Sequence, residues 1–361
     1  MKPIQFPKDE LPHPCTVEWW YFNGHLRDAR NKPYSFMHCL FRFNLKTLRD
    51  HIPILPDRVV HFSHGMVSDI TQKIYYPHAS HLALTSPESF TKPLLWVDYG
   101  RLFDVDPHYP WAIHEVKPFT YQLVNDQLDL TLTAVKKPVL VGGTGSLKLG
   151  KRHASYYALT RLETKGTLQI KGKTISVAGE SWTEHIWTSV QHLNAAWVWF
   201  SIQLTNHTEL VCFDHRAGGS TSCYASLSYP DNRHRHMTKF DLVPEGPAWK
   251  SPQTGATYQL GWRIAIPSAK LDIHIRPKVT NQEMAFLTPN YWEGAVAVEG
   301  TCDGKRVFGH GFLEIVGRKS NYLSATFFKD KLFSTAGESV GRAGALLSQW
   351  LNKYNREQKK L

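Results

Sequence analysis

The chain has 361 residues, which is long enough for a large core and for two domains. Its 42% hydrophobic and 20% charged residues are typical of a globular protein, and it has no apolar run of the roughly 20 residues that a membrane-spanning helix needs. The formal net charge of +11 permits an anionic partner, but the basic residues are spread along the chain. We therefore expect no nucleic-acid partner and no integral membrane segment.

The N-terminal residues MKPIQFPKDELPHP lack the apolar segment of about 7 to 15 residues that a secretory signal peptide needs. As written, the chain is expected to be cytoplasmic, or to be the mature form of an exported protein. Its five cysteines are widely spaced and form no CxxC pair. Neither a disulfide framework nor a cysteine zinc site is therefore expected.

Strand patterns dominate the chain. Residues 127–135 (QLDLTLTAV), 198–205 (VWFSIQLT) and 270–277 (KLDIHIRP) alternate apolar with more polar side chains. This period of two is typical of a strand with one buried face. Turn signals separate such runs, around Gly172, at residues 229–234 and at residues 303–304. The pattern predicts antiparallel sheets that form barrels or sandwiches.

The C-terminal stretch is the clear exception, because its apolar residues recur at spacings of three and four. This stripe predicts an amphipathic helix that docks on the outside of a barrel or across a homodimer interface; it contains Val340, Ala343, Leu347, Trp350, Leu351 and Tyr354. With a seam expected between residues 164 and 182, we predict three parts. They are an N-terminal β domain over residues 1–172, a C-terminal β domain over 173–332 and the helix over 333–361.

Several short motifs occur in an order that resembles the carotenoid 1,2-hydratase superfamily, the CrtC/AttH-like proteins. They are IQFPKDELPHPCTVEWWYFNGHL (4–26), YSFMHCLFR (34–42), HGMVSD (64–69), ASYYALTRLETKGTL (154–168) and GESWTEHIW (179–187), and the match continues to about residue 317. The resemblance implies a mainly β protein with two lipocalin-like antiparallel β-barrel or sandwich domains packed together around a ligand cavity. Relatives in this superfamily include hydratases of terpenoid and prenyl double bonds and fungal pericyclases.

The chain departs from the superfamily pattern at three motif positions. Glu184 stands where an aspartate is usual, Ile186 replaces the usual Glu or Gln, and Arg318 ends the last motif. The longer side chain of Glu184 still offers a carboxyl group, whereas Ile186 removes a polar group from the motif.

Glu184 is the first candidate for catalysis, because it lies between Trp182 and Trp187 in the sequence SWTEHIW. A carboxyl group among indoles is disfavoured as the anion, so it can remain protonated and act as a general acid toward an alkene. In this hypothesis Tyr157 and His185 position water, while Trp182, Trp187 and Trp20 shield the resulting cation. The alternative is a structural acid paired with an arginine or a tyrosine hydroxyl.

Glu18 is a second candidate, because its carboxylate adjoins two tryptophans in the sequence EWWY. In a strand it shares one face with Trp20, while Trp19 and Tyr21 share the other. Hydrogen bonds to Arg42 or Arg161 would make it a structural anchor, and otherwise it would line the ligand site. Further candidate substrate contacts, each with an equally available structural role, are His64, Tyr156, Trp199 and Glu293; Glu314 is another acid in an apolar run.

The expected function is therefore acid-catalysed addition of water to a double bond of a hydrophobic isoprenoid or polyketide-like molecule. Alternatives are a non-catalytic lipocalin-type carrier of a lipophilic metabolite and a cofactor-free cyclase or pericyclase. The close histidine pairs lack further ligands at metal-site spacing, and no nucleotide-binding loop is present. We expect no metal and no organic cofactor.

Overall fold

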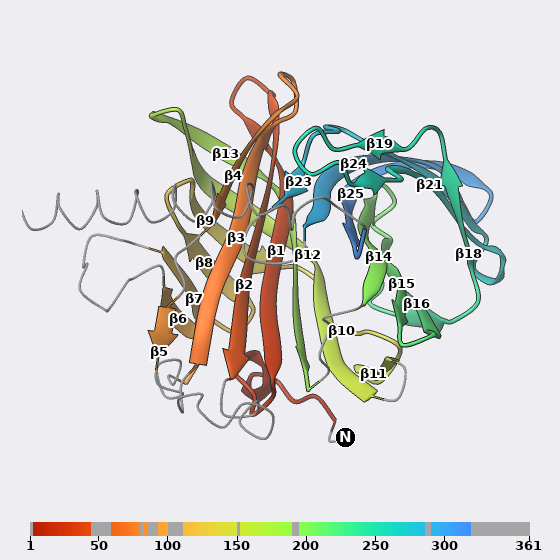
Figure 1. Ribbon diagram of the computed structural model, residues 1–361, viewed down its shortest axis with the longest axis horizontal. Helices are drawn as coiled ribbons and strands as arrows, with labels where there is room; N and C mark the ends of the chain where they lie inside the picture. The colour runs from red at the N-terminus through yellow and green to blue at the C-terminus, as the bar shows by residue number, and fades with distance from the viewer. Residues whose placement is uncertain are drawn as a thin grey trace, which may run out of the picture.

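Two curled antiparallel sheets lie side by side in the computed structural model of the protein (Figure 1). The structure describes residues 3–44, 59–79, 83–85, 93–99, 111–149, 152–189, 195–285 and 290–318. The predicted C-terminal helix over 333–361, and with it the expected homodimer contact, lies outside these residues. No helix in the described part of the chain is long and apolar enough to cross a membrane.

The first sheet is built from the N-terminal half of the chain. Its strand order is β4-β3-β2-β1-β13-β12-β9-β8-β7-β6, with β5 on β3 and both β10 and β11 on β12. The strands are β1 (Val17–Asp28), β2 (Pro33–Asn44), β3 (Val59–Asp69), β4 (Ile74–Ala79), β5 (Ala83–Thr85), β6 (Trp96–Tyr99), β7 (Trp111–Lys117), β8 (Thr120–Val124), β9 (Leu128–Ala134), β10 (Val139–Leu140), β11 (Ser146–Leu149), β12 (Arg152–Ile170) and β13 (Lys173–Thr188).

The second sheet follows in the order β17-β16-β15-β14-β25-β24-β22-β21-β18, with β23 on β24. Its strands are β14 (Ala196–Leu204), β15 (Glu209–Ala217), β16 (Ser220–Ser228), β17 (His234–Met237), β18 (Asp241–Glu245), β21 (Gly261–Ile266), β22 (Leu271–Pro277), β23 (Glu283–Met284), β24 (Tyr291–Cys302) and β25 (Lys305–Val316). A separate pair joins β19 (Trp249–Lys250) to β20 (Thr257–Tyr258), and the helical turns are η1 (Lys8–Glu10) and η4 (Pro267–Ala269).

The alternating runs of the sequence are confirmed as strands β9, β14 and β22. The seam between the sheets lies elsewhere than the expected residues 164–182. Strand β13 pairs with β1 and β12, so residues 173–188 belong to the first sheet, and the chain reaches the second sheet between Thr188 and Ala196. The expected boundary at residue 172 is a hairpin turn, in which Lys171 and Gly172 adopt φ values of 49° and 73°. Two successive left-handed residues are the geometry of a tight β-hairpin.

The buried apolar side chains form three clusters. One fills the curl of the first sheet, around Trp20, Phe36, Leu130 and Leu162, and one fills the curl of the second, around Phe200, Ile264, Ile273 and Leu313. The third lies between the sheets and contains residues of both, including Tyr21, Met37, Trp182, Trp199 and Phe312. We call this third cluster the interface layer.

Candidate functional site

Neighbouring side chains of β13 point to opposite faces of the first sheet, as strand geometry requires. Trp182 and Glu184 point into the interface layer, where Glu184 accepts hydrogen bonds from Tyr156 and Trp182. The next residue, His185, points into the curl of the first sheet and forms a hydrogen bond with Glu18. The same alternation on β12 sends Tyr156 to the interface layer and Tyr157 into the curl.

The predicted site residues therefore form two groups, not one. Glu18, Trp20, Tyr157, His185 and Trp187 gather on the inner side of the first sheet. The interface group contains Tyr156, Trp182, Glu184, Trp199, Glu293 and His64. The expectation that Tyr157 and His185 position water beside Glu184 is wrong, because the sheet itself separates them.

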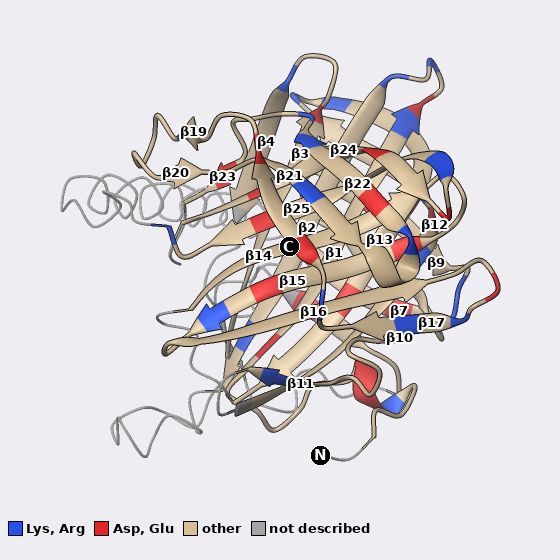
Figure 2. Cartoon of the chain, turned by 90° about the vertical axis from the view of Figure 1, so that its right-hand side faces the viewer, with Lys and Arg blue, Asp and Glu red and all other residues tan. Residues whose placement is uncertain are grey.

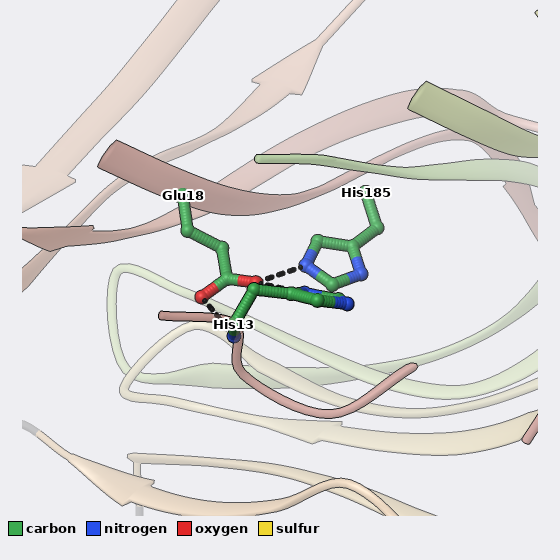
Figure 3. Close-up of side chains that lie close together, drawn as sticks. All are labelled: His13, Glu18 and His185. Atoms are coloured by element: carbon green, nitrogen blue, oxygen red, sulfur yellow. Dashed lines mark hydrogen bonds and ion pairs between the residues drawn. The ribbon is translucent and has the colours of Figure 1, made fainter. Parts of the chain in front are cut away.

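The inner group centres on Glu18, which is fully buried (Figure 3). Its Oε1 lies 2.8 Å from Nδ1 of His13 and 2.9 Å from Nε2 of His185, and its Oε2 lies 3.1 Å from Nη1 of Arg42. The backbone N–H of His13 also donates to both carboxylate oxygens at 3.1 Å. We call His13, Glu18, Arg42 and His185 the inner ion cluster.

Stacked rings surround the inner ion cluster. Trp20 stacks on His185 with ring centres 4.5 Å apart, and Trp187 stacks on His13 at 3.9 Å. Burial alone would raise the pKa of Glu18, but the hydrogen bonds and charges of His13 and His185 outweigh it and lower the pKa to about 2. Glu18 is thus an ionised anchor for the strand, as one of the two sequence hypotheses held, with Arg42 as a partner.

His13, Glu18 and His185 are also the set in the described chain whose geometry approaches a metal site, with one ligand atom each within 4.8 Å of the others. The residues fit a cation poorly. The guanidinium of Arg42 already pairs with Glu18, and the carboxylate is held by the His13 N–H at the same time. A second positive charge at this point would repel Arg42, so the cluster is complete as a hydrogen-bonded unit.

The N-terminal residues 3–16, which we call the N-terminal strap, hold the inner ion cluster in place. Glu10, in η1, accepts hydrogen bonds from the hydroxyls of Tyr121 (2.5 Å) and Tyr157 (2.7 Å). Burial, with the nearby charge of Glu115, raises the pKa of Glu10 to about 8. The ring of Phe6 packs 4.8 Å from that of Tyr157. Glu10 was missed in the sequence because the segment FPKDELPHP has no strand or helix periodicity.

The interface layer has a different chemistry, which follows from the strand register. Glu184, Tyr21, Cys39 and His64 are successive partners across β13, β1, β2 and β3. On the facing side, Trp199, Glu314 and Glu293 are successive partners across β14, β25 and β24. Because directly opposed residues share a face, each sheet presents one row of carboxyl and aromatic groups to the other.

Hydrogen bonds join the two rows. The hydroxyl of Tyr156 and Nε1 of Trp182 (3.2 Å) both donate to Oε2 of Glu184, and Nε1 of Trp199 donates to the Tyr156 oxygen at 2.9 Å. From the first sheet, the hydroxyl of Tyr21 donates to Oε1 of Glu293 at 2.8 Å. His64 lies 3.0 Å from the hydroxyl of Tyr291. Glu293 is therefore held by a contact that crosses between the sheets, whereas Glu184 is held within the first sheet and is linked to the second through Tyr156 and Trp199.

Glu184, Glu293 and Glu314, which we call the interface acids, form no ion pair with a lysine or arginine of the described residues. Burial raises the pKa of Glu184 to about 8, with a smaller contribution from the nearby Glu314. It raises the pKa of Glu314 to about 7 and that of Glu293 well above its usual value. The cause is desolvation without a compensating cation, which favours the neutral acid.

One side of the interface layer is only half buried. Trp19, Phe41, Ile186 and Trp197 pack against the buried cluster while retaining some exposed surface, and Glu314 is half-buried beside them. Ile186, the departure from the superfamily motif, contributes an apolar side chain to this region. An apolar molecule in contact with these side chains would lie against a wall of aromatic rings with neutral carboxyl groups.

The two groups thus differ in what they can do chemically. The inner ion cluster holds an ionised carboxylate that is hydrogen-bonded by His13, Arg42 and His185 and covered by the N-terminal strap. The interface acids are protonatable, surrounded by indole and phenol rings, and adjoin half-exposed apolar surface. We therefore take the interface layer as the candidate active site.

Comparisons with known proteins agree with this architecture. Solved structures that resemble the chain include a Nitrosomonas europaea protein described as an AttH (TM-score 0.73, 25% identity, 88% of this chain and 98% of that one). Another is kievitone hydratase from Nectria haematococca (TM-score 0.66, 16% identity, 87% and 93%). The expected lipocalin-like, mainly β fold is confirmed.

Two curated relatives carry functional names. Dehydratase asqC of Emericella nidulans is 23% identical over 203 residues, which are 53% of this chain and 58% of that protein. Kievitone hydratase of Fusarium solani subsp. phaseoli is 22% identical over 202 residues, or 53% and 57%. The matches span less than two thirds of either relative. A family model described as AttH-like matches residues 1–318, and the chain belongs to this family, as its motifs indicated.

Proposed function

We propose that the protein is a hydratase or dehydratase that adds water to, or removes it from, a double bond of an apolar small molecule, with Glu184 as the proton donor. The observation that carries this proposal is the position of Glu184. Its carboxyl group is buried between the sheets without a cationic partner, and burial raises its pKa to about 8. The names of the two relatives, a dehydratase and a hydratase, support water chemistry in one direction or the other.

The reaction follows from a neutral carboxyl group among aromatic rings. Glu184 would give its proton to an alkene carbon in hydration, or to a departing hydroxyl group in dehydration. The cation left behind would lie close to the indoles of Trp182 and Trp199, whose ring faces attract positive charge. Because no lysine or arginine of the described residues pairs with the interface acids, an uncharged isoprenoid or polyketide-like substrate fits better than an anionic one. No step requires an organic cofactor or a metal.

The proposal is tested with a panel of prenylated phenols and linear polyenes in water enriched in oxygen-18. With the wild type, mass spectrometry should detect an alcohol that carries oxygen-18. Glu184→Gln should lower the rate of its formation by roughly 100-fold to 10,000-fold, which is the usual contribution of a general acid to the rate. Glu163→Gln is the matched control, because Glu163 is exposed on β12 and the same substitution is made there outside the interface layer. It should retain the wild-type rate.

The two alternative functions predict other outcomes of the same assay. If the protein is a carrier, a bound panel compound should quench the tryptophan fluorescence of the protein, and mass spectrometry should find the compound chemically unchanged. A cyclase would give an isomer without label, at a rate that Glu184→Gln leaves near normal. Either result would contradict the proposed function.

A further inference from the structure

We propose that Glu314 is a second catalytic residue of this site, the base that takes the proton from the attacking water while Glu184 protonates the substrate from the opposite sheet. This inference rests on the proposed function. In hydration, the O–H bond of Glu184 breaks as a C–H bond forms, and the water oxygen then bonds to the cationic carbon. The proton that this water loses goes to the Glu314 carboxylate. In dehydration Glu184 would instead protonate the departing hydroxyl group, which leaves as water, and the Glu314 carboxylate would take the proton from the neighbouring carbon as the double bond forms. Solvent restores the protonation of both carboxyl groups between turnovers.

The register places Glu314 in the same layer as Glu184 but on the other sheet. It is the cross-strand partner of both Trp199 on β14 and Glu293 on β24. Trp199 in turn donates to Tyr156, which donates to Glu184. A substrate lying in this layer would therefore meet carboxyl groups from two directions, as an acid and a base acting on one double bond require.

Hydrogen bonding leaves Glu314 free to accept a proton. Nε1 of Trp197 donates to its Oε2 at 2.8 Å, and Oε1 has no hydrogen-bond partner among the described residues. Glu314 is also half-buried, whereas Glu184 is only 5% exposed and Glu293 1% exposed. Water can therefore reach Glu314 more readily than the other interface acids.

The electrostatics separate the two roles. The charge of Glu314 acts on six titratable groups: Glu184 on β13, Tyr21 on β1, Tyr156 on β12, Cys39 on β2, and Glu293 and Tyr291 on β24. His64 on β3 lies in the same layer and contacts Tyr291, not Glu314, among the described residues. None of these six groups becomes a cation. Burial raises the pKa of Glu314 to about 7 and that of Glu184 to about 8, so Glu314 ionises first as the pH rises. Its negative charge then raises the pKa of Glu184 and keeps that acid protonated.

Glu293 is less suited to be the base. Tyr21 donates to its Oε1, and burial together with the charges of Glu314 and Glu184 raises its pKa well above the usual value. It should remain a neutral acid at pH values where Glu314 has ionised. The control for Glu314→Gln is therefore Glu163→Gln, at an exposed position of β12 outside the interface layer.

The test combines kinetics with the state of the carboxyl groups in the free protein. With a panel compound that the wild type hydrates, Glu314→Gln should lower kcat at least 100-fold and abolish the fall of kcat toward acidic pH, which reports the ionised base. Binding, followed by tryptophan fluorescence, should change less than threefold. Glu314→Asp should retain the acidic limb at a lower kcat, and Glu163→Gln should retain both the acidic limb and the wild-type kcat.

Two results would overturn the inference without touching the proposed function. The first is an inactive Glu184→Gln together with a Glu314→Gln that keeps its kcat and acidic limb. The second needs no substrate: carbon-13 NMR of labelled glutamate carboxyl carbons should show one group titrating near pH 7 that is missing in Glu314→Gln. If no carboxyl group of the wild type titrates near pH 7 in this way, Glu314 is not the base. A fully active Glu184→Gln would instead refute the proposed function itself.

Discussion

Two glutamates of the first sheet, Glu18 and Glu184, are both buried beside tryptophans, yet their pKa values move in opposite directions. Glu18 has His13, His185 and Arg42 within hydrogen-bonding distance, and its pKa falls to about 2. Glu184 has only neutral donors, and burial raises its pKa to about 8. The sequence places an acid against indoles in both cases, and the partners that decide the charge come from distant segments.

The low pKa of Glu18 predicts how stability depends on acid. A group whose folded-state pKa lies below its unfolded value stabilises the fold above the unfolded pKa and loses this effect as the pH falls. A shift from 4.5 to about 2 corresponds to about 3 kcal/mol, lost between pH 4.5 and pH 2. Glu18→Gln should therefore be less stable than the wild type at pH 7, and the difference should shrink over this interval. Urea denaturation at a series of pH values checks it; a constant difference would contradict it.

The raised pKa of Glu184 predicts the opposite sign. In the unfolded chain this carboxyl group releases its proton above its ordinary pKa of 4.5, whereas folded Glu184 keeps its proton until about pH 8. The wild type should therefore lose stability as the pH rises from 4.5 to about 8. Glu184→Gln keeps an oxygen that can accept from Tyr156 and Trp182, but it cannot ionise. We expect it to be more stable than the wild type at pH 8 to 9, by several kcal/mol at most, while losing activity. Thermal unfolding at pH 5 and pH 9 measures this, and equal melting temperatures at pH 9 would refute it.

Among the elements, the strands were predictable from alternation, whereas the N-terminal strap was not. Strands β9, β14 and β22 repeat every second residue, and this signal is local. Glu10 and His13 are recognised only through Tyr121, Tyr157 and Glu18, which arrive from other elements. Neighbouring residues of a strand point to opposite faces, so Glu184 and His185 could not act together as the predicted mechanism required.

The N-terminal strap should contribute to stability through Glu10. Glu10→Ala removes the acceptor of two buried tyrosine hydroxyls, which should cost about 2 to 4 kcal/mol of the free energy of unfolding. Glu10→Gln retains an acceptor oxygen and should cost less. Urea denaturation of both variants distinguishes these values. An alanine variant as stable as the wild type would show that the strap is not held by this contact.

At the scale of the whole molecule, the two sheets are joined by contacts that no local pattern reveals. Basic and acidic residues are interspersed along the described chain (Figure 2). Arg161 on β12 is an exception, because it is buried and bridges the sheets. Its Nε donates to Glu209 on β15 at 2.7 Å, and Nη2 donates to the carbonyl oxygen of Leu204 at 3.2 Å. Glu184 and Glu314 face each other across the interface layer only because the two sheets pack in this way. The sequence therefore indicated each acid as a candidate but could not predict that they lie in the same layer.

Removing Arg161 should loosen the junction between the sheets. Arg161→Ala leaves Glu209, which is fully buried, with Lys136 as its remaining ion-pair partner, and should cost about 3 to 5 kcal/mol. Arg263→Ala is the control, since Arg263 and Asp272 are both about 40% exposed and their pair should be worth less than about 1 kcal/mol. Denaturation curves of the two variants compare these costs. Equal costs would contradict a structural role for Arg161.

The central claim is that Glu184 is a neutral acid between the sheets at physiological pH. Infrared difference spectroscopy of the free protein tests it directly, because a protonated carboxyl group has a carbonyl stretch that a carboxylate lacks. We expect a band at pH 7 that is missing in Glu184→Gln, remains in Glu163→Gln, and disappears from the wild type as the pH rises through about 8. A wild-type spectrum at pH 7 that contains no band removed by Glu184→Gln would contradict the account.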